Sequence, residues 1–292
     1  MIAVLGATGR VGQHVATGLA AAGVPARALV RNPASVDLPL ESLRADLHRP
    51  DTLPTALRGV ERLLLLTPHV PDQDLLEAAA VDAAAAAGVR RIVKISGGPA
   101  TLGPNGTTAT ATAHWRSEQR IDRSGLEFAF LRPSVFMQNL LETAAPGVSR
   151  TGLLTAPFGD APIAMVDARD VAACAVASLL DDRPLHAAWH LTGPRPVTYP
   201  AIAARLGVRH AKVPPTVTAA ALRRRGLPAP AVEHALRMAA YLAAGADGAV
   251  TDHVLRLTGA PPRSIEAFLA DHRDAFAPAT RVARLLSTTR AA

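Results

Sequence analysis

Gly6-Ala7-Thr8-Gly9-Arg10-Val11-Gly12 is the stretch of sequence that decides the fold of this chain. It follows Ile2-Ala3-Val4-Leu5, an apolar run typical of a buried strand, and apolar residues then recur at helical spacing. A strand, a glycine turn and a helix in this order predict the phosphate-binding unit of a dinucleotide fold. Gly6 permits the turn, Gly9 lets a pyrophosphate approach the backbone, and Gly12 lets the helix pack closely. The helix N-terminus then offers free N–H groups to the phosphates.

The composition limits the class of protein. The 292 residues allow one large domain or two small ones, and the hydrophobic share of 49% is enough for a substantial core. Asp82 interrupts one Ala-rich stretch and Asp247 follows another, so we expect no membrane-spanning helix. We also expect no signal peptide, because the predicted first strand starts at residue 2. The single cysteine, Cys174, excludes an internal disulfide and a cysteine-based zinc site. These features predict a cytoplasmic protein.

The net charge of +7 raises the question of a nucleic-acid partner. Almost all basic residues are Arg, with Lys only at positions 94 and 212, which is typical of a GC-rich genome. The compact basic run Arg223-Arg224-Arg225 has no interleaved aromatic residues, so a solvated helix end explains it better than a nucleic-acid patch. We expect a small-molecule substrate, no nucleic-acid or membrane partner, and a monomer or homodimer.

Strands and helices alternate through the first half of the chain. The apolar runs predict strands at 2–5, 26–30, 42–45, 63–66, 91–96 and 126–131, with helices at 51–58, 74–87 and 110–124. The Gly-, Pro- and Thr-rich segment 99–109 is expected to be a mobile loop over the site. This alternation predicts an α/β fold with a doubly wound parallel sheet, a Rossmann domain.

Residues around the carboxyl ends of these strands are the candidates for cofactor binding. Arg31 ends the second strand and no acidic residue follows before Asp37, which favours the 2′-phosphate of NADP(H) over the free ribose of NAD, unless Arg31 is an ordinary surface residue. Asp46 either accepts a bond from the adenine amino group or caps the next segment. The predicted cofactor-binding residues are Gly6, Thr8, Gly9, Arg10, Val11, Gly12, Arg31, Asn32, Asp46, Leu66, Thr67, Pro68, Ser96 and Gly97.

The pattern changes past Pro133, where prolines and glycines break the chain into short pieces. We expect an NADP(H)-binding Rossmann domain over 1–145 and a smaller irregular substrate lobe over 146–277, with 163–192 returning to the first domain. Residues 278–292 are expected to form a loose tail. The predicted elements here are helices at 167–180, 199–206, 216–225, 229–244 and 262–275 and a strand at 189–191.

Several of these segments together resemble the NmrA-like branch of the atypical short-chain dehydrogenases. The segments that carry the resemblance are 6–12, 30–33, 65–68, 114–118, 124–126, 131–133, 136–140 and 166–172, spread over nearly the whole chain. The resemblance implies an NADP(H)-binding Rossmann domain with a small C-terminal substrate lobe. The family includes quinone reductases, reductases of phenolic and alkaloid substrates, and redox-sensing regulators with little or no catalysis.

One departure from the wider group concerns the catalytic residues. Ordinary short-chain dehydrogenases use a Tyr with a Lys four residues later, whereas this chain has only Tyr199 and Tyr241, neither followed by Lys at that spacing. His114 and Glu118 stand four residues apart on the expected helix and share one face. His114 is either a proton donor or a group that orders the loop or binds substrate, and Glu118 is expected to support it.

Candidate substrate-binding residues follow the sixth strand. We expect Phe136 and Met137 to pack the floor of the cleft rather than to contact substrate. Asn139 either orients a polar group of the substrate or makes an internal hydrogen bond. His186 and His190 have no third ligand nearby, so no metal site is predicted. No serine stands in a nucleophile-elbow pattern, which leaves hydrolase chemistry unsupported.

The predicted function is hydride transfer from NADPH to an apolar conjugated electrophile, namely a quinone, an enone, an iminium or a ketone, with a natural-product intermediate as one candidate. Such an acceptor suits a site without Tyr and Lys, because its charge is delocalised and solvent can deliver the proton. The alternative is a non-catalytic redox sensor that binds NADP(H) and acts through a protein partner. A cofactor-binding isomerase or cyclase is a third, weaker alternative.

Overall fold

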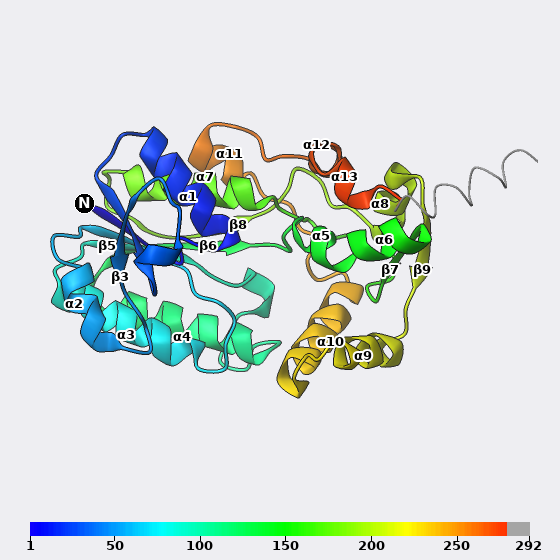
Figure 1. The fold of residues 1–292 in the computed structure, drawn as a ribbon, viewed down its shortest axis with the longest axis horizontal. Helices are drawn as coiled ribbons and strands as arrows, with labels where there is room; N and C mark the ends of the chain where they lie inside the picture. The colour runs from blue at the N-terminus through cyan, green and yellow to red at the C-terminus, as the bar shows by residue number, and fades with distance from the viewer. Residues whose placement is uncertain (279–292) are drawn as a thin grey trace, which may run out of the picture. The chain divides into compact units, whose positions relative to one another are not determined.

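The computed structural model describes residues 1–278, which divide into two compact units. The first unit comprises 1–133, 168–191 and 252–261, and the second comprises 134–167, 192–251 and the described residues from 262 onward (Figure 1). The chain therefore leaves the first unit after its sixth strand and returns to it twice. The domain limits predicted from the sequence, at residues 145 and 277, stay a prediction, and the predicted loose tail lies almost wholly outside the described residues. In the described part, no helix combines the length and apolar character that crossing a membrane requires.

The first unit is built on a seven-stranded parallel sheet, which confirms the predicted doubly wound fold. The spatial order is β3-β2-β1-β4-β5-β6-β8, and the direction of winding reverses between β1 and β4. Leu5 of β1 lies opposite Leu29 of β2 and Leu65 of β4 in this parallel register. The strands are β1 (Ile2–Leu5), β2 (Ala26–Val30), β3 (Glu41–Arg44), β4 (Arg62–Leu65), β5 (Arg91–Ile95), β6 (Glu127–Pro133) and β8 (His186–Leu191).

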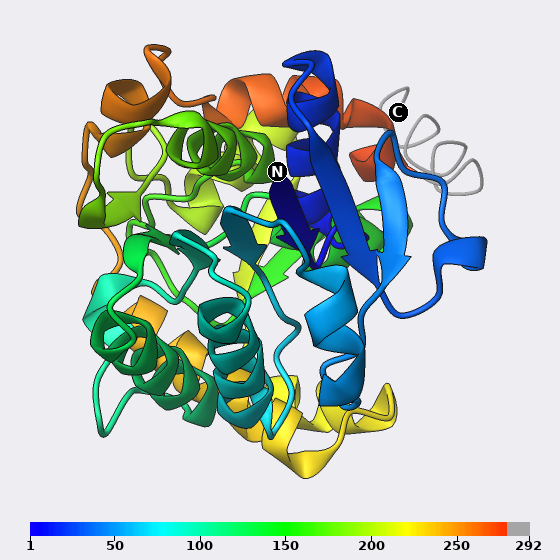
Figure 2. The same cartoon turned by 90° about the vertical axis from the view of Figure 1, so that its left-hand side faces the viewer.

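Helices cover both faces of this sheet. Helices α1 (Arg10–Ala21) and α7 (Ala168–Leu180) pack together on one face, and α3 (Gln73–Ala86) packs with α4 (Ala109–Arg123) on the other (Figures 1 and 2). Leu63, Leu64 and Leu65 of the central strand are fully buried between the two layers. This burial on both faces explains why the strand is a continuous apolar run.

Some short elements differ from the prediction. The predicted helix 51–58 is a 3₁₀ turn (Pro50–Thr52) followed by α2 (Leu53–Ala56), because prolines at 50 and 54 interrupt it. The predicted strand 189–191 begins earlier, at His186, where pairing with Phe128 of β6 extends it. Helix α11 (His253–Thr258), which packs against α7 and β8, was not predicted. Two further 3₁₀ turns span Pro33–Ser35 and Pro99–Thr101.

The second unit is mainly helical, with a small parallel sheet of β7 (Leu153–Ala156) and β9 (Arg209–Lys212). Neither strand was predicted, and the predicted helix 262–275 is divided at His272. Met137, Leu154, Ile202 and Phe268 belong to its core. The helices are α5 (Asn139–Thr143), α6 (Ala145–Thr151), α8 (Tyr199–Leu206), α9 (Pro215–Arg224), α10 (Ala229–Ala243), α12 (Ile265–Asp271) and α13 (Arg273–Phe276).

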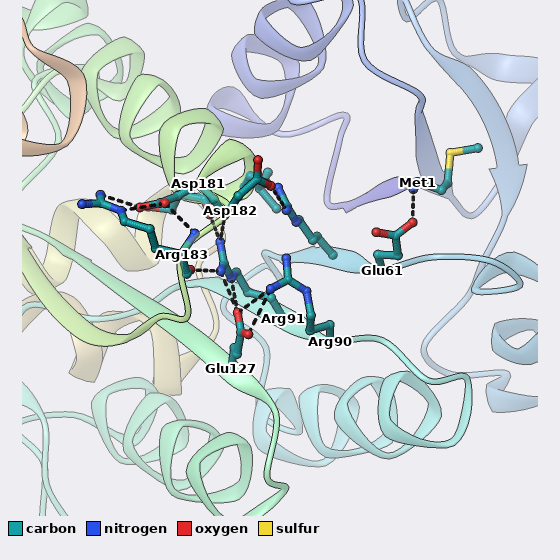
Figure 3. A network of polar contacts seen from close by, with 11 residues as sticks. Met1, Glu61, Arg90, Arg91, Glu127, Asp181, Asp182 and Arg183 are labelled. Carbon is teal, nitrogen blue, oxygen red and sulfur yellow. Dashed lines mark hydrogen bonds and ion pairs between the residues drawn. The ribbon is translucent and has the colours of Figure 1, made fainter.

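A buried arginine closes the C-terminal end of α7 at the amino edge of the sheet (Figure 3). Arg91 begins β5, is fully buried, and donates to the carbonyl oxygen of Ser178 at 3.0 Å and to those of Asp181 and Arg183. Its Nε and Nη2 also bind the carboxylate of Glu127 on β6, at 2.9 and 2.6 Å. Because the last carbonyls of a helix lack partners within the helix, this guanidinium satisfies them and faces the negative end of the helix dipole.

A second arginine acts beside the first. Arg62, at the beginning of β4, donates to the carbonyl oxygen of Leu179 at 2.6 Å and binds the carboxylate of Asp182 at 2.5 Å. Two neighbouring strands thus hold the same helix end. This arrangement fixes the position of α7, and α7 in turn packs against α1, the helix that follows the glycine turn.

We predict that Arg91→Met lowers the free energy of unfolding by about 3 kcal/mol, because it leaves the carbonyl oxygens at the end of α7 without their donor and removes one of the two arginines that bind Glu127. Urea unfolding followed by circular dichroism measures this loss. Arg120→Met is the matched control, since Arg120 forms an ion pair with Asp82 in which both side chains are about half exposed, and its loss should cost less than about 1 kcal/mol. Similar losses for the two variants would contradict the proposed role of the buried cap.

Candidate functional site

The glycine turn connects the carboxyl end of β1 to α1 and packs against Leu66, the residue after β4. Gly6 has a positive φ of 85°, and a Cβ placed on it would lie 2.3 Å from the carbonyl oxygen of Leu66. A Cβ on Gly12 would lie 2.0 Å from the carbonyl oxygen of Gly6. Both distances are far below van der Waals contact, so the turn closes only with glycine at both positions.

Gly9 differs from its two neighbours in the motif. It is the N-cap of α1 with extended backbone angles, its N–H binds the carbonyl oxygen of Gly6 at 3.0 Å, and no side chain caps the helix. A Cβ on Gly9 would meet one atom within 4 Å, the carbonyl oxygen of Gly6 at 3.3 Å. The missing side chain therefore leaves space in front of the helix N-terminus, and this cradle fits a pyrophosphate. Of the other predicted residues here, Thr8 and Arg10 are exposed and Val11 is part of the core.

The residues predicted to contact the adenosine half lie after β2 and β3. Arg31 and Asn32 are exposed directly after β2, and the carbonyl of Asn32 accepts from Ser35. Asp46 accepts from the backbone N–H of His48 at 3.1 Å through Oδ1. This bond lies within the loop before the 3₁₀ turn at Pro50–Thr52, whose N-cap is Arg49 and has no side-chain cap, so both alternatives for Asp46 stay predictions. The exposed place of Arg31 directly after β2 agrees with the sequence, and its pairing with a 2′-phosphate stays a prediction.

The loops after β4 and β5 place the remaining predicted cofactor residues. Leu66 is half-buried beside Gly6, and Pro68 is exposed. Thr67 is buried and turns inward, donating from Oγ1 to Glu77 at 2.6 Å. Ser96 is buried after β5, and its backbone N–H binds the carbonyl oxygen of Leu131. Gly97 packs beside the imidazole of His114, since a Cβ on it would lie 3.3 Å from Cδ2.

A buried polar network surrounds His114. Lys94 of β5 and Glu77 of α3 form an ion pair at 2.5 Å, and both side chains are 0% exposed. Gln73, also fully buried, donates to Glu77 Oε1 at 3.2 Å. Its Nε2 lies 3.3 Å from Nδ1 and 3.5 Å from Nε2 of His114. The ring of His69 stands nearly perpendicular to that of His114, with centroids 5.6 Å apart.

The charges of this network set the state of its titratable groups. Burial alone would raise the pKa of Glu77, but the charge of the Lys94 ammonium and its hydrogen bond to the carboxylate outweigh burial and lower that pKa to about 2. Burial and the nearby Lys94 ammonium hold the pKa of His114 well below its ordinary value, against the opposing effect of Glu77. Glu77 is therefore ionised and His114 neutral at physiological pH. A neutral imidazole does not suit the predicted role of His114 as proton donor, and it favours the positioning alternative.

The predicted partnership of Glu118 with His114 is corrected by the structure. Both residues are buried on α4, but the carboxylate of Glu118 binds Arg132 of β6 through Nε at 3.0 Å and Nη2 at 2.5 Å. A bidentate guanidinium satisfies a carboxylate more strongly than a neutral imidazole does. The carboxylate near His114 is instead Glu77, which lies on a different helix.

The predicted substrate-binding residues belong to the second unit. Met137 is buried in its core, as the packing interpretation expects, and Phe136 is half-buried and forms a bridge with Val166. Asn139 begins α5, and its carbonyl accepts from Thr143. Contact of these three residues with substrate stays a prediction.

The sequence analysis missed Gln73, Glu77 and Lys94 as members of the site. Two of them carry a signal that was available: Lys94 interrupts an apolar strand, and Glu77 stands among alanines of a buried helix face. A charge in such a place must find a partner, because an unpaired buried charge costs several kcal/mol. Their pairing across α3 and β5 is a tertiary contact that neither segment reveals by itself.

We predict that Gly9→Val and Gly12→Ala separate the two roles of the glycine motif, which are dinucleotide binding and close packing of the turn. Gly9→Val should leave the fold intact within about 1 kcal/mol but abolish dinucleotide binding, because the branched side chain occupies the phosphate space. Gly12→Ala should destabilise the fold, because its Cβ meets backbone. Thermal unfolding and NADPH titration by fluorescence test both variants. Normal NADPH binding by Gly9→Val would place the phosphates elsewhere.

Comparisons with known proteins agree with this geometry. The model of the NmrA-like family matches residues 1–204. The (4-alkanoyl-5-oxo-2,5-dihydrofuran-3-yl)methyl phosphate reductase of Streptomyces griseus is 37% identical over 95% of this chain and 100% of its own length. The NAD(P)H azoreductase of Xenophilus azovorans is 33% identical over 96% of this chain and 100% of its own.

A solved structure shows the same architecture. The NADPH-dependent quinone oxidoreductase QOR2 of Escherichia coli, crystallised with NADPH, superimposes with a TM-score of 0.83 at 27% identity. The match covers 93% of this chain and 99% of that one. The similarity therefore extends through both units of the chain.

Proposed function

This chain belongs to the NmrA-like family, and on that basis we propose that it is an NADPH-dependent reductase that transfers hydride to a conjugated, electron-poor acceptor. The observation that carries the proposal is the glycine cradle, where Gly9 leaves open the space in front of the α1 N-terminus. When bound there, NADPH supplies the hydride. In this proposal Gly6, Gly9 and Gly12 shape the phosphate site, and Arg31 pairs with the 2′-phosphate.

The residues available for proton transfer support an acceptor that needs no strong protein acid. Tyr199 is buried in the core of the second unit, and burial raises its pKa. Tyr241 donates to the carbonyl oxygen of Ala246, and burial together with Asp247 raises its pKa to about 12. His114 is neutral. Water therefore delivers the proton that completes the reduction.

The relatives support the same class of acceptor. The names of the two full-length relatives describe reduction of an acyl dihydrofuranone phosphate and of azo compounds, and the structural neighbour is named an NADPH-dependent quinone oxidoreductase. In each case the accepting atom belongs to a conjugated system that spreads the negative charge left by hydride. We assign this chain the same class: an enone, a quinone or a related conjugated electrophile.

A turnover assay tests the proposal. It follows the oxidation of NADPH, at saturating concentration, with a panel of alkylidene or acyl butenolides, quinones, azo compounds and simple ketones. Sustained turnover is expected with the conjugated acceptors, at rates well above those with simple ketones. Tight NADPH binding without turnover on any acceptor would overturn it and favour the redox sensor.

We predict that Arg31→Ala weakens NADPH binding about ten- to a hundredfold, because a hydrogen bond to a charged group contributes roughly 1.5–3 kcal/mol. NADH has no 2′-phosphate, so its binding should stay nearly unchanged. Calorimetric titration with both cofactors measures the difference. An equal loss for NADPH and NADH would remove Arg31 from the 2′-phosphate site.

A further inference from the structure

We propose that Glu77 and Lys94 are positioning residues for the nicotinamide half of NADPH, because their ion pair tethers the loop after β4 through Thr67. Residues 66–68 form this loop, which follows β4 at the point where the winding of the sheet reverses. The role in binding rests on the proposed function, in which NADPH occupies the glycine cradle. The tether itself consists of hydrogen bonds within the first unit.

The carboxylate of Glu77 joins three elements of the first unit. Lys94 of β5 binds its Oε2 at 2.5 Å, while Oε1 accepts from Thr67 at 2.6 Å and from Gln73 of α3 at 3.2 Å. All four side chains are buried, so bulk water does not compete for these bonds. An ionised carboxylate only accepts, so the hydroxyl of Thr67 is the donor. Such charge-assisted bonds are roughly twice as strong as neutral ones.

The tethered loop is held at a second point by the glycine turn. The carbonyl oxygen of Leu66, the residue before Thr67, lies at the place that a Cβ on Gly6 would need. The loop is therefore fixed between the turn after β1 and the carboxylate of Glu77. In this proposal the hydroxyl of Thr67 holds the loop in place, and the backbone of the loop forms a wall of the cofactor crevice.

The order of the strands assigns this loop to one half of NADPH. A dinucleotide fold places the pyrophosphate at the turn after its first strand and the adenosine ribose beside the end of the second. In the order β3-β2-β1-β4-β5, the adenosine half then belongs on the β2 side of the turn, and the nicotinamide half belongs on the other side, at β4 and β5. Thr67 follows β4 and Lys94 is part of β5, so the Glu77 carboxylate links the two strands that serve the nicotinamide half.

Binding measurements without any acceptor test the proposal. NADPH reports on the whole cofactor site, whereas adenosine 2′,5′-bisphosphate contains only the adenosine half. Thr67→Val removes the hydroxyl and keeps the branched shape of the side chain. We expect it to weaken NADPH binding about tenfold, on the scale of one hydrogen bond to a charged group, and to leave bisphosphate binding unchanged. Calorimetric titration measures both affinities.

Thr67→Ser retains the hydroxyl and should bind NADPH within about threefold of the unmodified protein. Normal NADPH binding by a folded Thr67→Val variant would overturn the proposal. An equal loss of affinity for NADPH and for the bisphosphate would also overturn it, because the tether would then act on the whole site.

A double variant separates positioning from stability. Glu77→Leu/Lys94→Met replaces the ion pair with apolar side chains and leaves no unpaired buried charge, so the free energy of unfolding should stay the same or rise. NADPH binding should nevertheless weaken as much as in Thr67→Val, with bisphosphate binding unchanged. Thr67→Val added to the double variant should cause little further loss, because its hydrogen bond is already absent. Independent, additive losses would contradict the tether.

Thr198→Val is the matched control. The hydroxyl of Thr198 accepts from the backbone N–H of Ala201 and caps α8 in the second unit. Its loss should lower the thermal midpoint by roughly 2–4 °C and leave the affinities for both ligands unchanged. A loss of NADPH affinity equal to that of Thr67→Val would remove the special role of the β4 loop.

Failure of this proposal and failure of the proposed function give different results. If the unmodified protein binds NADPH but reduces no acceptor, the reductase function is overturned and the tether is still judged from the binding data. If the unmodified protein does not bind NADPH, both proposals are overturned.

Discussion

The first unit depends on the close approach of three backbone segments at the end of β1. The carbonyl oxygen of Gly6 occupies the space that a Cβ on Gly12 would need, and the carbonyl oxygen of Leu66 occupies the space that a Cβ on Gly6 would need. The first contact brings the beginning of α1 against the turn, and the second brings the loop after β4 against the same turn. Because the winding of the sheet reverses between β1 and β4, these contacts lie where an open α/β sheet binds its ligand.

The buried charges of the first unit have different roles at the two edges of its sheet. At the amino edge, Arg91 and Arg62 satisfy the last carbonyls of α7 and anchor the helix layer that contains α1. At the carboxyl edge, the Lys94–Glu77 pair satisfies no helix end and instead orients Gln73, whose amide nitrogen lies near both ring nitrogens of His114. A buried ion pair contributes little to stability over apolar packing, because its desolvation is costly. Its place beside the predicted site therefore favours a role in orientation.

Much of the fold could be predicted because its signals are local. The alternation of apolar strands and Ala-rich helices predicted the first six strands of the parallel sheet to within about two residues at each boundary, and the glycine spacing predicted the turn. Strands β7 and β9 could not be predicted in this way, since Arg209-His210-Ala211-Lys212 has no strand pattern and is extended only because it pairs with 153–156. Helix α11 was missed for a related reason: it is short and is supported by packing against α7 and β8.

The candidate site shows the same division between local and tertiary information. The spacing of His114 and Glu118 correctly indicated that both lie on a buried face of α4, but spacing cannot say which strand residue that face meets. Arg132 of β6 meets Glu118, and this leaves His114 to a network supplied by α3 and β5. Burial and the Lys94 ammonium hold the pKa of His114 well below its ordinary value, so its imidazole is neutral beside the carboxyl edge of β5. Under the proposed function, a neutral imidazole at this place suits acceptors that tolerate the negative charge left by hydride until water protonates them, a property that enones, quinones and azo compounds share.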